Sequence, residues 1–176
     1  MRAPGTTERS ALPILICILV AQVLASARAD ELPRRKPGLW ESTLHLETSR
    51  HAPPRTRLCL DEATDALSLR YGLGLAKDQC SQMEIKGSGH EFTIRSTCVI
   101  GQYRVTTQSV MTFDGNTAYH FVAQSHYDPP LNGRSETRTE QDGRWIGACE
   151  PGQKPGDMVI DPPGIRMNVR DALGKN

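Results

Sequence analysis

The histidines are the first residues of this chain whose side chains could take part in acid–base chemistry or bind a metal. His120 and His126 share one face of a predicted strand. Six residues of extended chain separate them by about 20 Å, too far for both to hold one metal ion. His45, His51 and His90 are isolated in the sequence. The histidines therefore predict no metal site, and we interpret His120 and His126 as surface residues.

Three clustered carboxylates, Asp61, Glu62 and Asp65, could indicate calcium binding or acid–base chemistry. A calcium loop needs a glycine for its sharp turn, and this cluster has none. The same residues suit the first turn of a helix, where Asp is a good N-cap and acidic groups favour the positive end of the helix dipole. The chain also has no G-x-S-x-G or H-E-x-x-H motif. We therefore expect no catalytic residue, no metal and no cofactor.

Two tryptophans, Trp40 and Trp145, stand near the two ends of the predicted domain. Core packing explains them most simply. The strands between them are poor in large apolar residues, so the core is thin. Because aromatic side chains also line the mouths of small β-barrels, Trp40 and Trp145 are the candidate ligand-pocket residues.

The first 29 residues are typical of a cleavable signal peptide. Arg2 and Arg9 form a basic start, and the apolar run from Ala11 to Leu24 has 14 residues, fewer than the roughly 20 that a membrane-spanning helix needs. Small residues at Ala27 and Ala29 then mark a cleavage site before Asp30. The sequence predicts export to the periplasm, with no transmembrane span after cleavage.

The chain is nearly neutral, with 21 Lys and Arg against 20 Asp and Glu. Nucleic-acid binding needs clustered positive charge, so this balance argues against a nucleic-acid partner. The densest basic cluster is Arg34-Arg35-Lys36. We interpret it as a solvated segment leading into the domain.

The rest of the chain predicts a mainly β domain with one short helix at about residues 61–70. Alternation of apolar and polar residues indicates strands, and Gly- or Pro-containing turns separate them. Gly143 inside the last strand suggests a bulge or kink. The predicted strands are Leu39–Glu47, Thr56–Leu60, a hairpin from Cys80 to Cys98 that turns at Gly87–His90, Tyr103–Phe113, Thr117–Tyr127 and Ser135–Cys149.

These elements form an antiparallel meander of about seven strands, closed into a barrel or folded into a sandwich. The domain extends over residues 30–149. Residues 150–176 are rich in Pro and Gly and contain few large apolar residues. We predict that this tail is flexible and lies outside the packed domain.

Four cysteines remain after cleavage: Cys59, Cys80, Cys98 and Cys149. Zinc sites usually supply closely spaced cysteine pairs, whereas here the closest two are 18 positions apart, so an exported chain is expected to form two disulfides. If Met83 and Ile85 face Ile94 and Phe92, Cys80 lies opposite Thr97 unless a bulge intervenes. We therefore favour Cys59–Cys80 with Cys98–Cys149. Cys80–Cys98 with Cys59–Cys149 is the alternative.

The combined landmarks resemble a bacterial family of exported proteins known only as a domain of unknown function. They are the segment Lys36-Pro37-Gly38-Leu39-Trp40-Glu41, the segment Arg57-Leu58-Cys59-Leu60, the cysteines Cys80 and Cys98, and the terminal Gly147-Ala148-Cys149. The resemblance implies a periplasmic setting and a four-cysteine framework over about residues 33–149, but no activity. This chain departs from the usual family pattern by the tail that follows Cys149.

The leading functional hypothesis is a non-catalytic periplasmic domain that binds a partner or supports the cell envelope. Its partner would be a small apolar or lipid-like ligand in a barrel mouth, or an envelope protein held on a sheet edge or through the tail. The alternative is an uncharacterised, hydrolase-like periplasmic enzyme whose site is assembled from residues distant in sequence. Convergence of His120 or His126 with a carboxylate in a cleft would favour that alternative.

Overall fold

The computed structural model describes residues 32–47, 49, 51–72 and 79–173. The predicted signal peptide, residues 1–29, lies outside the described residues. None of the helices in the described ranges has the length and apolar character of a membrane-spanning segment.

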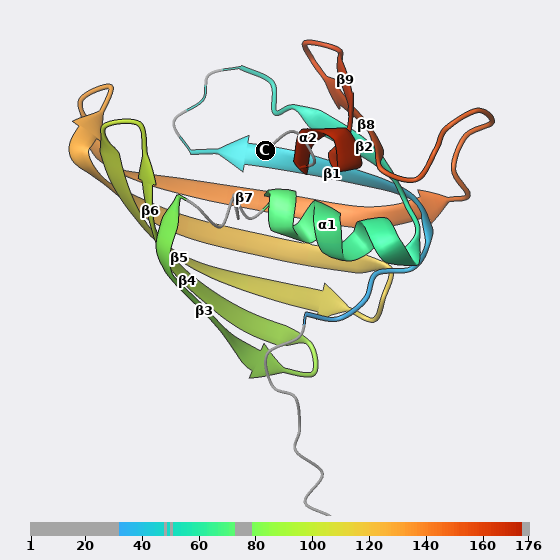
Figure 1. Cartoon of the computed structure of the whole chain (residues 1–176), viewed down its shortest axis with the longest axis horizontal. Helices are drawn as coiled ribbons and strands as arrows, with labels where there is room; N and C mark the ends of the chain where they lie inside the picture. Colours follow the sequence, from blue (N-terminus) through green and yellow to red (C-terminus); the bar gives the residue numbers. More distant parts are fainter. Residues whose placement is uncertain (1–31, 48, 50, 73–78, 174–176) are drawn as a thin grey trace, which may run out of the picture.

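All nine described strands belong to one antiparallel sheet, in the order β3-β4-β5-β6-β7-β1-β2-β8-β9. Two helices, α1 and α2, complete the described part, and α1 crosses the inside of the curved sheet (Figure 1). The elements are β1 (Gly38–Leu46), β2 (Arg55–Leu60), α1 (Glu62–Gly72), β3 (Cys80–Ser88), β4 (Glu91–Ile100), β5 (Tyr103–Asp114), β6 (Ala118–Leu131), β7 (Arg134–Gly147), β8 (Asp157–Asp161), β9 (Ile165–Asn168) and α2 (Val169–Leu173).

The predicted mainly β class is confirmed, and the seven predicted strands correspond to β1–β7. The meander runs from β3 to β7 and returns to β1, which lies between β7 and β2. Alternation determines which face of each strand is buried. In β5, Val105, Ser109, Met111 and Phe113 are buried, whereas the residues between them are more exposed.

One hydrophobic core lies on the concave face of the sheet, the face that α1 and α2 cover. Strands throughout the sheet contribute to it, and Val169 of α2 is completely buried. The fully or nearly buried members are Trp40, Leu58, Leu60, Phe92, Ile94, Met111, Phe113, Tyr119, Met158 and Val169.

The helix α1 begins where the sequence predicts, through a reciprocal capping arrangement. The Asp61 carboxylate accepts a hydrogen bond from the Thr64 backbone N–H at 2.7 Å, and the Thr64 hydroxyl accepts one from the Asp61 N–H at 2.9 Å. These bonds satisfy donors that a helix start leaves without intrahelical partners. The Thr64 hydroxyl also donates to the Asp61 carboxylate at 2.7 Å, and this bond is the largest cause that keeps the pKa of Asp61 below its usual range.

The prediction that residues 150–176 lie outside the packed domain is wrong for residues 157–173. The strand β8 pairs with β2, β9 pairs with β8, and Met158 joins the core. Of the Pro- and Gly-rich stretches, the one around residues 161–164 forms the turn between β8 and β9, and the one around residues 150–156 connects β7 to β8. Alternation over only four or five residues is a weak signal, which is why the sequence does not reveal these strands.

The favoured disulfide pairing is also wrong, and the alternative is correct. Cys80 bonds to Cys98, hereafter the hairpin disulfide, and Cys59 bonds to Cys149, hereafter the long-range disulfide. The β3–β4 turn contains only Gly89 and His90, and a bulge beside Cys80 then places it opposite Cys98. Gly89 adopts φ 68°, which suits glycine in such a turn.

Candidate ligand cavity on the concave face

A cavity of about 270 Å³ lies on the concave face between the sheet and α1. Its volume is just below the roughly 300–1,000 Å³ of ordinary small-molecule sites. Strands β1, β2, β5, β6, β7 and β8 supply most of the lining. The apolar and aromatic lining residues are Trp40, Leu44, Leu58, Leu69, Met111, Tyr119, Phe121, Met158 and Ile160, and the other lining residues are Arg35, Ser42, Thr56, Ser68 and Gln141.

Trp40 lines this cavity, whereas Trp145 is not among its lining residues. The indole N–H groups of both residues donate hydrogen bonds to the segment that leads into β1. The Trp40 Nε1–H donates to the Lys36 carbonyl at 2.8 Å, and the Trp145 Nε1–H donates to the Pro37 carbonyl at 3.0 Å. A side chain at Gly38 would approach the Trp145 ring nitrogen to 2.5 Å, so glycine is needed there. The Lys36–Glu41 motif therefore has a structural explanation.

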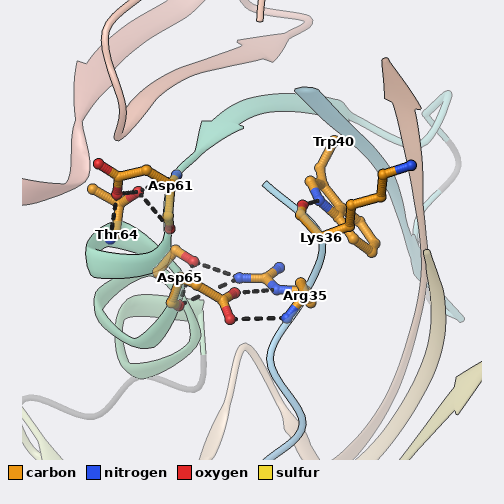
Figure 2. A network of polar contacts seen from close by, with 7 residues as sticks. Arg35, Lys36, Trp40, Asp61, Thr64 and Asp65 are labelled. Carbon is orange, nitrogen blue, oxygen red and sulfur yellow. Dashed lines mark hydrogen bonds and ion pairs between the residues drawn. The ribbon is translucent and has the colours of Figure 1, made fainter. Parts of the chain in front are cut away.

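A buried ion pair forms the polar end of the cavity, and Figure 2 shows how it joins the lead-in segment to α1. The Arg35 Nε donates to one Asp65 carboxylate oxygen at 2.7 Å, and the Arg35 backbone N–H donates to the other at 3.0 Å. The side chains are only 5% and 4% exposed. The interpretation of Arg35 as part of a solvated segment is therefore wrong, because Asp65 compensates its charge inside the protein.

Two aromatic rings lie beside the Arg35 guanidinium. Its carbon lies 5.5 Å from the Trp40 ring centroid and 5.8 Å from the Tyr119 ring centroid. The Trp40 and Tyr119 rings stack on each other with centroids 5.9 Å apart. Such contacts stabilise a cation through the electron-rich ring faces.

Tyr119 extends across Gly143 of the neighbouring strand. A Cβ at Gly143 would lie 2.1 Å from the Tyr119 ring, so the missing side chain makes room for it. Of the bulge or kink predicted at Gly143, the bulge is absent, because the registers of β7 with β6 and with β1 both continue unbroken through this residue. Burial raises the pKa of the Tyr119 phenol, although Arg35 and a hydrogen bond with Ser42 oppose that shift, so the phenol stays neutral.

Sequence reasoning identifies Trp40 but misses the Arg35–Asp65 pair. Asp65 is assigned to helix-end electrostatics, and Arg35 is grouped with its exposed neighbours. One signal was present, since α1 carries Thr64, Asp65 and Ser68 on the face that the structure buries. A polar buried face requires polar partners elsewhere in the chain.

A second hollow, of about 580 Å³, lies on the opposite face and contains His120 and Asp142. These residues are direct neighbours on β6 and β7, and the His120 Nδ1 lies 2.8 Å from an Asp142 carboxylate oxygen. Their side chains are 47% and 64% exposed. His126 lies 3.9 Å from Glu136 on the same pair of strands. No group of three potential metal ligands occurs among the residues with described positions.

The fold and the cavity together define a disulfide-bonded, single-sheet β domain with a largely apolar internal site. Residues 35–149 match the family described as "Protein of unknown function (DUF3617)". The chain belongs to this family. No curated protein and no solved structure matches the chain.

Proposed function

We propose that this protein is an exported, non-catalytic binding module that holds a small, mainly apolar ligand in the concave-face cavity. The observation that carries the proposal is the lining of that cavity. Apolar side chains dominate it, and a few hydroxyl and amide groups lie beside them. Sites with this composition bind ligands through apolar burial and use the polar groups for orientation.

Export rests on separate support. Residues 1–29 have the pattern of a signal peptide, and all four cysteines of the later chain form disulfides. We therefore expect the mature chain to begin at Asp30 in the periplasm. The mass of protein purified from the periplasm of a Gram-negative host tests this expectation, because retention of residues 1–29 would contradict it.

The binding test uses the neutral fluorescent probe N-phenyl-1-naphthylamine and two tryptophan variants. Leu44 lines the cavity on β1, so Leu44→Trp should fill part of the space and weaken probe binding about tenfold or more. Leu46→Trp is the matched control, since Leu46 lies two residues further along the same strand face and outside the cavity lining. Circular dichroism verifies that both variants fold.

Enhanced probe fluorescence in wild type and L46W, with a loss in L44W, supports the proposal. Equal binding in all three proteins would place the probe elsewhere and refute the cavity as the site. Native mass spectrometry of the periplasmic protein is the second measurement, since a co-purified adduct would reveal the mass of a natural ligand.

A hydrolase-like enzyme is the second candidate, and the His120–Asp142 contact is the observation that favours it. A carboxylate at the Nδ1 side orients a histidine as it does in hydrolytic triads. Both groups are half-exposed strand neighbours, however, and among the described hydrogen bonds none joins His120 to a nucleophile. Hydrolysis of p-nitrophenyl acetate that is much faster than with free imidazole at the same concentration, and that disappears in His120→Ala, would favour this candidate.

A further inference from the structure

The polar end of the cavity determines which ligand chemistry it accepts. Among the described lining residues, Arg35 alone carries a charge. Asp65 neutralises that charge through one carboxylate oxygen, which accepts from the Arg35 Nε, and its other oxygen accepts the Arg35 backbone N–H. The pair is almost fully buried, so water screens it little. The site therefore already has balanced charge before a ligand enters.

A second nitrogen of the Arg35 guanidinium also donates to α1. Its Nη2 donates to the Ser68 hydroxyl, and the Ser68 hydroxyl in turn donates to the Asp65 carbonyl at 2.8 Å. The stacked Trp40 and Tyr119 rings lie beside the guanidinium. An incoming carboxylate would have to displace Asp65 or add an uncompensated negative charge to a buried site, and both are unfavourable.

Uncharged polar groups continue the polar end along β1, β6 and β7. The Gln141 side-chain amide donates to the Ser42 hydroxyl at 3.0 Å, and the Tyr119 phenol lies beside Ser42 and Arg35. Hydroxyl and amide groups both donate and accept hydrogen bonds. They can therefore pair with an alcohol or amide on a ligand without any change of net charge.

We propose that the cavity selects uncharged amphiphiles, with an apolar body and an alcohol or amide end, and rejects carboxylates and amines of the same chain length. This inference rests on the proposed function, since it requires that the cavity binds ligands. It adds the chemical class of the ligand.

The test displaces bound N-phenyl-1-naphthylamine with four ligands of one chain length: octanol, octanamide, octanoate and octylamine. All are used at neutral pH, where octanoate is anionic and octylamine is cationic, and below their micelle concentrations. We expect octanol and octanamide to bind at least about tenfold more tightly than the two charged ligands. Octanoate or octylamine binding as tightly as octanol would overturn the proposal.

The variant Asp65→Asn tests the cause of the selectivity. It removes the compensating charge and leaves the Arg35 cation at the end of the cavity, so the octanoate-to-octanol affinity ratio should rise about tenfold. Asp61→Asn is the matched control, because it removes the same charge from the start of the same helix at a residue that bonds to Thr64 and Arg170 rather than to Arg35. That variant should leave the ratio unchanged.

An equal ratio in D65N, D61N and wild type would overturn the assignment of selectivity to the Arg35–Asp65 pair. If D65N does not fold, the wild-type ligand series decides the proposal. Failure of the probe and of all four ligands to bind would refute the proposed function itself. Tight binding of octanoate would refute only the selectivity.

Discussion

The contact between Tyr119 and Gly143 gives the sharpest test of how this core is built. Gly143 has an ordinary strand backbone, so alanine is compatible with its conformation. The obstacle is the Tyr119 ring, whose nearest atoms would lie 2.1 and 2.2 Å from the new Cβ. Real contacts of this kind stay above 3.0 Å. In Gly143→Ala the ring must therefore move away from its stack on Trp40.

Two opposing effects determine how much Gly143→Ala changes the free energy of unfolding. Forcing an extra methyl group into a packed core costs about 1–3 kcal/mol. Alanine in place of glycine inside a strand stabilises the folded state by about 0.5–1 kcal/mol. The displaced ring also loses contact with Trp40 and Phe113, which lie 5.9 and 6.3 Å from it between centroids. We expect Gly143→Ala to lower the free energy of unfolding by about 2 kcal/mol.

A double-mutant cycle with Tyr119→Val isolates the contact. Valine removes the ring and keeps a β-branched residue that suits the strand. In that background, Gly143→Ala should be neutral or slightly stabilising, which gives a coupling energy of about 2 kcal/mol. Urea unfolding, followed by far-ultraviolet circular dichroism with both disulfides intact, measures all four proteins. If Gly143→Ala costs the same in both backgrounds, within about 0.5 kcal/mol, the explanation of Gly143 is refuted.

Three further predictions concern the disulfides, the C-terminal segment and acid stability. Replacing both cysteines of the long-range disulfide with serine should cost about 4.6 kcal/mol, against about 3.2 kcal/mol for the hairpin disulfide. The cause is the longer closed loop, with a separation of 90 rather than 18 residues, and urea titrations showing the reverse order would contradict it. Val169→Asp should destabilise by about 4 kcal/mol or more, because it buries a carboxylate in the core. If thermal unfolding shows a loss of stability below about 1 kcal/mol, the result would instead indicate that residues 157–173 lie outside the packed domain. The hydrogen bond from Arg144, supported by Arg55 and Arg57, keeps the pKa of Glu41 below its usual range. The stability that Glu41 contributes is therefore present above pH 4.5 and is lost as the pH falls through its folded-state pKa. Urea unfolding midpoints measured over this pH range should fall less steeply in Glu41→Gln than in wild type.

The places where sequence reasoning fails share a physical cause. In the β3–β4 hairpin, the predicted and observed registers differ by two positions, since Ile85 lies opposite Ile94 rather than Phe92. A shift of two residues keeps every side chain on its predicted face, so the alternation pattern does not reveal it. The turn length and the bulge beside Cys80 set the register, and these determine the disulfide partner.

In the candidate site, too, the sequence does not reveal which distant residues meet. Arg35 and Asp65 are 30 positions apart, and neither residue's local pattern indicates the other. Trp40 was a candidate from its type alone, and the cavity lining includes it. The other lining residues come from α1, the lead-in segment and several strands, which meet only when the sheet curves around α1.

The sequence by itself determined the mainly β class, the first seven strands and the start of α1. Alternation and capping depend on residues a few positions apart, so they can be read along the chain. Only the tertiary structure decided the disulfide pairing, the burial of Arg35, the docking of residues 157–173 and the position of the cavity. Each of these depends on which distant segments come together, because burial and cross-strand register belong to the assembled sheet rather than to any one segment.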